Sequence, residues 1–388
     1  MAKLGELGKI ITGNTPKTSD AQNYRSNDIC FVKPSDFTDN EITEIHQSEF
    51  YISEYAKDRA RVLPTDSILV TCIGIIGKVA INKVPCAFNQ QINAIIPERK
   101  ICDPRYVAYA IQNVQPQMQN TANAAVVPIL NKTQFSNIEI PLPSLETQKQ
   151  IVEFLDKVTS LISLRKQQLA KLDELVKARF VEMFGDPADN IKNLPASPMT
   201  AICQIIDGDR GKNYPKQEEF SDSGFCLFLN AKNVTAQGFS FENCTYITEE
   251  KDALLRNGKL CRGDVVLTTR GTIGNLAFYD TSVPYENIRI NSGMVILRMN
   301  KQVVSEIFFI EQFKMQLDSI KSRIASGSAQ PQLPISTMNK IEMILPPIEL
   351  QNQFSTVVER VDQQKQTVQQ SLEKLELMKK ALMQEYFG

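Results

Sequence analysis

The chain has 388 residues, with 43 Lys and Arg against 44 Asp and Glu, eight Cys, no Trp and a single His. At roughly 100–200 residues per domain, this length predicts two or three domains. One histidine excludes zinc sites that need two, and a catalytic triad could use only His46. Because the neighbours of His46 are polar, we expect it to be an exposed surface residue.

The cysteines form no C-x-x-C pair, which argues against a zinc site or a thioredoxin-like redox site. We expect them to be reduced and buried as small apolar side chains, and this usage indicates a cytoplasmic protein. No apolar run approaches the roughly 20 residues that span a membrane, so we expect no membrane association. The overall charge balance neither identifies nor excludes a nucleic-acid-binding protein.

In chain order, the sequence predicts an α/β module over 1–143, a long helix, a second α/β module over 188–344 and another long helix. In both modules short apolar runs indicate strands, and a glycine pair marks a tight turn between two of them. The predicted strands are 29–32, 67–70, 79–81, 264–267 and 294–297, the predicted turns are 74–77 and 271–274, and the predicted helical stretches lie near 104–120 and 302–321. Two loops rich in turn formers cover 13–27 and 208–224.

The two halves of the chain are copies of one pattern. The segment Leu7–Gly13 matches Ile202–Gly208, 195 residues later, and Leu142–Gln148 matches Leu345–Gln351, 203 residues later. A drift of eight residues in the offset is expected if insertions lie in loops. We therefore predict one architecture, built twice.

The long helices lie within residues 144–187 and 345–388, and each carries apolar residues at alternating four- and three-residue spacings. Such a repeat over more than four heptads is typical of a coiled-coil seam. We predict that the helices pair along a seam made of Leu155, Val158, Ile162, Leu169, Leu172, Val176, Val358, Val361, Val368, Leu372, Leu375 and Leu382. A whole module connects the helices, so either orientation is possible, and we favour the antiparallel one. The alternative is that each helix packs only on its own module.

The sequence lacks a phosphate-binding loop and an Asn-Pro-Pro-Tyr motif for methylating bases. The acidic pairs Glu218-Glu219 and Glu249-Glu250 leave a metal-dependent nuclease as one alternative, and a coiled-coil adaptor that binds only protein is another. We predict no metal site and no catalytic residue. Two similar but non-identical modules on a rigid spacer suit an asymmetric target with two parts at a set distance.

These residues resemble the specificity subunit of type I restriction-modification systems over essentially the whole chain. The resemblance rests on Leu142–Ile151 leading into a helix that ends at Met183–Pro187, and on the second copy from Leu345–Gln351 to Tyr386–Gly388. Asp264–Leu267, Gly271–Asn275 and the loop Ser326–Gln330 also look like that family's recognition domains. In the first copy this loop is replaced by Asn123–Val127.

The resemblance implies a non-catalytic, DNA-binding protein of two α/β (α+β) recognition domains, pseudo-repeated copies joined by two long helices that form a coiled coil. Each domain would recognise one half of a bipartite, double-stranded DNA site, and the helices would set the gap and dock the methylation subunits. The resemblance also implies two adenine-methylating subunits and ATP-driven restriction (motor) subunits as partners. S-adenosylmethionine, ATP and Mg would then belong to those partners, and this chain would have no cofactor of its own.

Specific DNA contacts favour Arg, Lys, Asn and Gln on base edges, so we look for these residues in the turn-rich loops. The candidate DNA-binding residues are Lys17, Arg25, Asn89, Gln90 and Gln91 in the first copy, and Arg210, Lys212, Lys216, Arg270, Arg289, Ser328 and Gln330 in the second. Arg270 is the sharpest candidate, because it directly precedes a glycine turn. We match it to Cys72 in the first copy, so it could distinguish the two half-sites.

The charge is also balanced segment by segment. Residues 1–143 carry 14 basic and 14 acidic residues, 144–187 carry 7 and 7, 188–344 carry 17 and 17, and 345–388 carry 5 and 6. Since no segment is a basic arm, we expect the isolated chain to bind DNA weakly.

Overall fold

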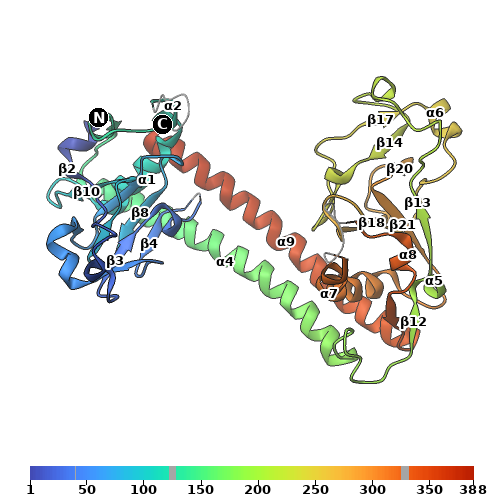
Figure 1. Cartoon of the computed structure of the whole chain (residues 1–388). Coiled ribbons are helices and arrows are strands. Elements are labelled where there is room, and N and C mark those ends of the chain that lie inside the picture. Colours follow the sequence, from blue (N-terminus) through green and yellow to red (C-terminus); the bar gives the residue numbers. More distant parts are fainter. Residues whose placement is uncertain (40, 122–127, 325–331) are drawn as a thin grey trace. The chain divides into compact units, whose positions relative to one another are not determined.

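The structure is a computed structural model that describes residues 1–39, 41–121, 128–324 and 332–388. It divides into two compact units, each drawn with its sheets and helices in Figure 1. Unit 1 comprises Met1–Lys166 and Gln369–Gly388, and unit 2 comprises Gln167–Val368. Each unit therefore contains one α/β module and a part of both long helices.

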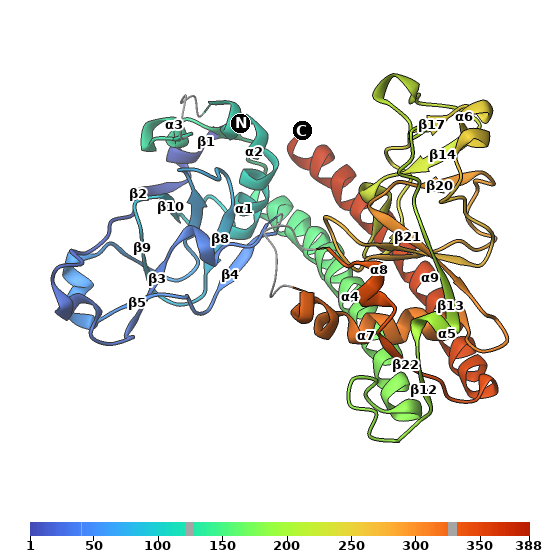
Figure 2. The same ribbon diagram turned by 45° about the vertical axis from the view of Figure 1, so that its right-hand side comes forward.

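Unit 1 contains two main sheets. The first has five strands in the order β2-β10-β7-β8-β4, and the second has four in the order β5-β3-β9-β6. The helices of the module are α1, which lies beside β8 (Figure 2), and the shorter α2 and α3. The elements are β1 (Ala2–Lys3), β2 (Gly8–Thr12), β3 (Ile29–Val32), β4 (Thr43–Ile45), β5 (Tyr51–Ile52), β6 (Val62–Leu63), β7 (Ile68–Thr71), β8 (Val79–Asn82), β9 (Cys86–Phe88), β10 (Ile92–Pro97), β11 (Glu139–Ile140), α1 (Pro104–Asn113), α2 (Gln115–Thr121) and α3 (Lys132–Ser136).

Unit 2 repeats this plan with a four-stranded sheet, β13-β21-β18-β19, and a three-stranded sheet, β17-β14-β20. The parallel pair β14–β20 corresponds to the parallel pair β3–β9 of unit 1. Its elements are β12 (Ala196–Pro198), β13 (Cys203–Asp207), β14 (Cys226–Leu229), β15 (Val234–Thr235), β16 (Gly238–Phe239), β17 (Tyr246–Ile247), β18 (Asp264–Thr268), β19 (Leu276–Phe278), β20 (Ile288–Ile290), β21 (Met294–Met299), β22 (Glu342–Ile344), α5 (Met199–Ile202), α6 (Glu249–Leu254), α7 (Glu306–Ile324) and α8 (Ile335–Met338).

The predicted repeat and glycine turns are confirmed. All residues of β7 and of β18 are buried, which explains why both strands are nearly continuous apolar runs. The turns that follow them place Gly74, Gly77, Gly271 and Gly274 at φ values of 77°, 87°, 71° and 94°. These left-handed angles are accessible to glycine at little cost, so the G-x-x-G spacing is a backbone requirement.

The long helices are α4 (Leu145–Phe184) and α9 (Ile348–Phe387), each of 40 residues. They run antiparallel within each unit. In unit 1 Lys166 lies 3.6 Å from Glu376, and in unit 2 Lys365 lies 2.5 Å from Asp173. The predicted fold class of two α/β modules and two paired helices is therefore confirmed.

Nine of the twelve predicted seam residues are buried, and Leu169, Leu375 and Leu382 are half-buried. The helix ends differ from the predicted pattern. Continued to the helix ends, the four- and three-residue spacing would bury Met183 and Tyr386, but Phe184 and Phe387 are buried instead. The reason is that each helix end also packs into the core of a module, where Phe184 contacts Phe308 and Phe387 contacts Tyr106.

This packing also explains why the boundary between the two units falls within both long helices. Unit 1 contains the start of α4 and the end of α9, and unit 2 contains the end of α4 and the start of α9. In each unit the first long helix of the module, α1 or α7, lies in the same core as these two helix parts. Among the described residues, no helix has the length and apolar character needed to cross a membrane.

Candidate nucleic-acid interface

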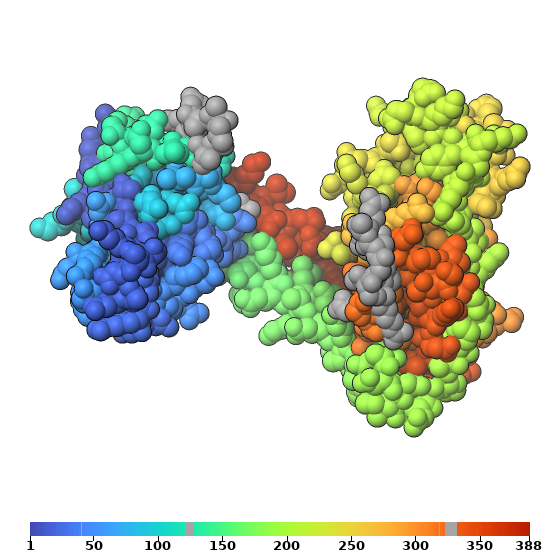
Figure 3. Space-filling model, viewed as in Figure 1, coloured from blue at the N-terminus to red at the C-terminus, as the bar shows by residue number. Residues whose placement is uncertain are grey.

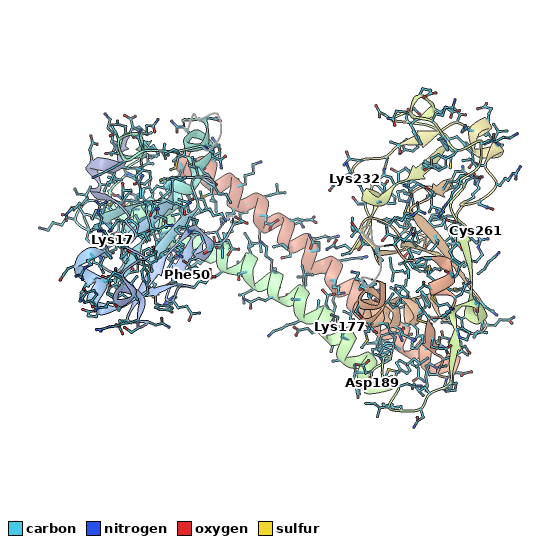
Figure 4. The ribbon with its side chains drawn as sticks, viewed as in Figure 1. Lys17, Phe50, Lys177, Asp189, Lys232 and Cys261 are labelled. Carbon is cyan, nitrogen blue, oxygen red and sulfur yellow. The ribbon has the colours of Figure 1, made fainter. Side chains whose placement is uncertain are left out.

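The loops that carry most of the predicted DNA-binding residues leave the large sheet of unit 1 at one end. Strands β2 and β7 finish where β10 begins, because Thr12 pairs with Asn93 and Thr71 pairs with Ile92. We call this end, with residues 13–27, 72–78 and 89–91, the loop end of unit 1. Lys17, labelled in Figure 4, lies in its first loop.

Hydrogen bonds join these three segments. The Gly13 N–H donates to the Ile92 carbonyl at 3.0 Å, and the Cys72 N–H donates to the Gln91 carbonyl at 2.8 Å. The Thr15 hydroxyl donates to Gln90 Oε1 at 2.6 Å. The loop end is therefore one connected surface.

Unit 2 has the same loop end, made of residues 208–224, 269–275 and 291–293. The Thr269 N–H donates to the Gly293 carbonyl at 2.9 Å, as Cys72 does to Gln91. In both units an asparagine starts the turn before an inner strand of the sheet, β10 or β21. Asn89 accepts from the Gln91 N–H, and Asn291 accepts from the Gly293 N–H. Figure 3 shows unit 2 coloured by residue number. Most of this loop end belongs to the yellow-green to yellow part, and α7 and α8 belong to the orange part.

A glycine in each loop end lies directly against this asparagine. A Cβ atom on Gly13 would come within 2.0 Å of the Asn89 carbonyl oxygen, and one on Gly208 within 2.2 Å of the Asn291 carbonyl oxygen. Real Cβ atoms do not approach an oxygen so closely. The repeated glycine at the end of β2 and β13 is therefore required for this turn to pack.

In unit 1 the candidates Lys17, Arg25 and Gln90 are exposed, and Gln91 is half-buried. Asn89 is a correction. It is 7% exposed, and its side chain donates to Gln91 Oε1 while accepting from the Gln91 N–H, so it shapes the turn and is not free to reach a base.

In unit 2 the candidates Arg210, Lys212, Lys216 and Arg270 are exposed. Arg210 lies 3.1 Å from Asp207 and donates to the Ser292 carbonyl, which ties it to the 291–293 turn. The Arg270 N–H donates to the Gly293 carbonyl of the same turn, so Arg210 and Arg270 flank it. Ser328 and Gln330, with the loop Ser326–Gln330 and the segment Asn123–Val127, lie outside the described residues.

Arg289 is the second correction. Its side chain is 6% exposed and donates from Nε to Asp252 at 2.5 Å and from Nη1 to the Asn257 carbonyl at 2.7 Å. Its remaining nitrogen donates to the carbonyls of Asp252 and Leu255. A buried guanidinium whose three nitrogens are all bonded inside the protein is not placed to contact DNA.

The counterpart of Arg270 is Ile73 rather than Cys72, which is the third correction. Ile73 forms a β-bridge with Ile129, and Arg270 forms one with Gln332. Cys72 instead matches Thr269, through the equivalent backbone hydrogen bonds described above. The position before the glycine turn is thus apolar in one copy and cationic in the other.

Several basic residues that lie beside the loop ends were missed in the sequence. Arg59 donates to the Tyr55 carbonyl at 2.7 Å and its guanidinium lies 4.0 Å from the Tyr55 ring centroid, while Arg25 lies 5.9 Å from the same ring. The Arg61 N–H donates to Asn14 Oδ1 at 2.9 Å. The signal that could have found them is the spacing Arg59-x-Arg61 directly before a short apolar strand.

In unit 2 the missed residue is Arg256, which is exposed beside the loop that follows β13. Asp209 joins the two segments, because its carboxylate accepts from the N–H groups of Gly211 and Arg256, both at 2.7 Å. Burial alone would raise the pKa of Asp209, but the backbone hydrogen bonds and the charge of Arg289 lower it overall. The ionised carboxylate therefore holds the basic loop in place.

The side chains considered for other chemistry are the histidine, the cysteines and the acidic pairs. His46 is exposed, as predicted, and its Nε2 lies 3.7 Å from Glu44 Oε2. All eight cysteines are free, and six are buried. Glu219 lies 2.8 Å from Lys251, and the described parts of the chain contain no group of three or more His, Cys, Asp or Glu placed to hold a metal ion.

The comparisons with known proteins decide the family. The model of the type I restriction modification DNA specificity domain matches the chain twice, over residues 1–174 and 198–377. The chain belongs to this family. Its function is therefore DNA specificity in type I restriction-modification, and the nuclease and adaptor hypotheses find no support.

Similar proteins extend over most of the chain. The MjaIX specificity subunit of Methanocaldococcus jannaschii is 24% identical over 390 residues, covering 92% of this chain and 85% of that protein. The EcoR124I/EcoR124II specificity subunit of Escherichia coli is 31% identical over 186 residues, covering 46% of this chain and 45% of that protein. The type I S subunit of M. genitalium has the same fold, with a TM-score of 0.58 and 15% identity over 100% of this chain and 95% of that one.

Proposed function

We propose that each unit of this specificity protein recognises one half of a bipartite, asymmetric DNA site with its loop end. The observation that carries the proposal is that one backbone frame occurs twice with different exposed side chains. Lys17, Arg25 and Gln90 occupy the frame in unit 1, and Arg210, Lys212 and Arg270 occupy it in unit 2. Equal frames with different polar groups suit two half-sites of different sequence.

In this proposal α4 and α9 set the gap between the half-sites, and the chemistry belongs to partner subunits in the cytoplasm. Two methylation subunits would bring S-adenosylmethionine, and restriction subunits would bring ATP and Mg. The specificity chain would supply the sequence recognition that directs them. It is expected to contribute no catalytic residue.

The experiment that tests this function is methylation mapping of genomic DNA. Cells that carry the chain with its methylation subunits should show methylated adenines in one bipartite motif, and cells that lack only this chain should lose that motif completely. A genome without a bipartite adenine pattern in either strain would contradict the proposal. Unchanged methylation after deletion would contradict it as well.

We further propose that the methylation subunit docks on an apolar stripe of α4 in unit 1. Phe154, Leu161 and Leu164 are 56%, 44% and 58% exposed, although they belong to a helix whose seam is already buried. Their spacings of seven and three residues place them on one side of the helix. Large apolar side chains kept together in water are typical of a protein-binding surface.

Leu161→Glu tests this docking surface against Ala170→Glu, an exposed residue about 180° around the same helix from Leu161. The first variant should lose the methylation subunit in co-purification, because a carboxylate would have to be buried in the interface. The control should retain it, and both should unfold at the wild-type temperature. Equal retention of the subunit by both variants would contradict docking at the stripe.

A further inference from the structure

The repeat places one buried glutamine in the first turn of each long helix. Gln148 in α4 and Gln351 in α9 both have no exposed surface. They occupy matching positions in Leu142–Gln148 and Leu345–Gln351, the most similar segments of the two copies. Neither is part of the loop ends or of the helix seam.

Gln148 joins α4 to the segment that begins α1. Its Oε1 accepts from the Asp103 N–H at 2.9 Å, and its Nε2 donates to the Ile101 carbonyl at 3.3 Å and to the Pro143 carbonyl at 2.9 Å. Asp103 is the N-cap residue of α1, with its carboxylate accepting from the Arg105 and Tyr106 N–H groups. One side chain thus connects the start of the module's helix to the start of the spacer helix.

Gln351 makes the same three bonds in unit 2. Its Oε1 accepts from the Ser305 N–H at 3.0 Å, and its Nε2 donates to the Val303 carbonyl at 3.1 Å and to the Pro346 carbonyl at 2.9 Å. Ser305 directly precedes α7, as Asp103 directly precedes α1. The two joints therefore have one geometry.

The other polar contacts at these joints differ between the copies. In unit 1 Asp156 of α4 accepts from Arg105 and Tyr109 of α1, at 2.7 Å and 2.6 Å. In unit 2 the hydroxyls of Ser305 and Ser355 lie 2.8 Å apart. Of these side-chain contacts between described residues, the glutamine bonds are the ones that occur in both units. Each amide uses its acceptor and both of its donor hydrogens on backbone groups.

We infer that Gln148 and Gln351 are positioning residues that fix the angle at which each recognition module leaves its spacer helix. They thereby select the length of the gap between the half-sites. The inference rests on the proposed function, because a gap has meaning only if the two units recognise two half-sites. One base pair changes the separation of the half-sites by about 3.4 Å and their relative rotation by about 35°. A joint that tolerated such changes could not reject a wrong gap.

The test uses the full chain assembled with its methylation subunits, after the motif has been mapped. Binding is measured on duplexes with the native gap and with gaps one base pair shorter and longer. Gln148→Met and Gln351→Met keep the side-chain length and remove the three hydrogen bonds. Each variant should reduce the preference for the native gap by about tenfold, because the freed backbone groups no longer hold one angle. The base preference within each half-site should stay unchanged.

Gln150→Met and Gln353→Met are the matched controls, since these exposed glutamines lie two residues further along the same helices. They should keep the wild-type gap preference. If Gln148→Met does not fold, Gln148→Asn offers a milder change at the same joint, because its shorter amide cannot reach all three backbone groups.

A purely structural role would lower the unfolding temperature of the variants and leave their gap preference at the wild-type value. That result in Gln351→Met and in a folded position-148 variant would overturn the inference while leaving the proposed function intact. Binding of the wild-type assembly to single half-sites with no gap preference at all would overturn the proposed function and this inference together.

Discussion

At the scale of single residues, Arg289 and Asp252 form the buried ion pair that closes unit 2. The Arg289 guanidinium also holds three backbone carbonyls, from Asp252, Leu255 and Asn257. Lys259 donates to the other oxygen of Asp252 at 2.6 Å. The pair thus fixes α6 and the segment that follows it against β20.

Replacing Arg289 with Ala should destabilise unit 2 strongly. The change leaves the buried Asp252 carboxylate with Lys259 but without Arg289, and it also removes the donor to three backbone carbonyls. Removing one partner of a buried pair costs about 3–5 kcal/mol. Urea unfolding of the variant measures this loss, with Arg262→Ala as a control because Arg262 is exposed in the same unit. Wild-type stability combined with lost DNA binding would instead restore Arg289 as a DNA contact.

The Asp252 carboxylate makes this stability dependent on pH. Burial alone would raise the pKa of Asp252, but hydrogen bonds from Lys259 and Arg289 and the charge of Arg289 lower it overall. A lowered pKa in the folded state stabilises the protein above the pKa of the unfolded chain, near 4, and this contribution is lost as the pH falls through the folded pKa.

Asp252→Asn should therefore be less stable than wild type at pH 7, and the difference should shrink as the pH falls below about 4. Urea unfolding of both proteins at several pH values measures it. A difference that stays constant from pH 7 to the acid range would show that the Asp252 charge does not stabilise unit 2.

Arg270 has the opposite environment, since it is exposed at the 291–293 turn. Arg270→Ala should weaken binding of the assembled complex to its specific site by about 1–3 kcal/mol and relax the base preference in one half-site only. Arg262→Ala is again the control, because it lies before β18 at the opposite end from Arg270. Unchanged footprints of Arg270→Ala at both half-sites would remove Arg270 from the interface.

At the scale of elements, Gly208, which directly follows β13, decides whether the loop end of unit 2 can form. Gly208→Ala would place a methyl group against the Asn291 carbonyl, so the 291–293 turn would have to move. We expect lower affinity for the half-site of unit 2 with the half-site of unit 1 still protected in footprinting. Gly238→Ala is the control for a glycine with open space around its Cβ position, although its φ of 109° adds local strain. Loss of protection at both half-sites would contradict a local effect.

The sequence predicted the elements whose cause is local. A glycine pair required at positive φ, and a heptad repeat such as Leu155, Val158 and Ile162, are visible in one stretch of chain. The helix ends were predicted less well, because Phe184 and Phe387 are buried by contacts with distant residues of α7 and α1. A period extrapolated along a helix does not show which residues the core of a module will bury.

The same limit applies to the candidate interface. Turn-rich composition located the loops, and Lys17, Arg210 and Arg270 are exposed there. Composition could not separate the exposed Arg270 from the buried Arg289. Arg289 is buried in an ion pair with Asp252, which lies 37 residues earlier in the chain. Likewise Asn89 satisfies the rule for a base-contacting residue, but its amide is used to close its own turn.

At the scale of the whole molecule, the balance of charge limits how tightly this chain alone can hold DNA. The chain carries 43 basic and 44 acidic residues, and Arg210 of the candidate interface also lies beside an aspartate. Affinity for DNA comes mainly from basic groups that neutralise phosphates and release counterions. A balanced chain that recognises bases through a few exposed cations therefore needs partner subunits to supply phosphate contacts.

The isolated chain should bind its mapped site only in the micromolar range typical of non-specific complexes, about 10⁻⁶–10⁻⁴ M at physiological salt. Adding the methylation subunits should tighten binding to the cognate duplex at least about a hundredfold, towards the 10⁻⁸ M or tighter that specific complexes reach. Fluorescence anisotropy with the cognate duplex and with a duplex scrambled in one half-site measures both steps. The added subunits should also steepen the dependence of affinity on salt, because more phosphates are then neutralised. Nanomolar, sequence-specific binding by the isolated chain would mean that its two loop ends suffice to grip DNA, and that partner subunits are not needed to supply phosphate contacts.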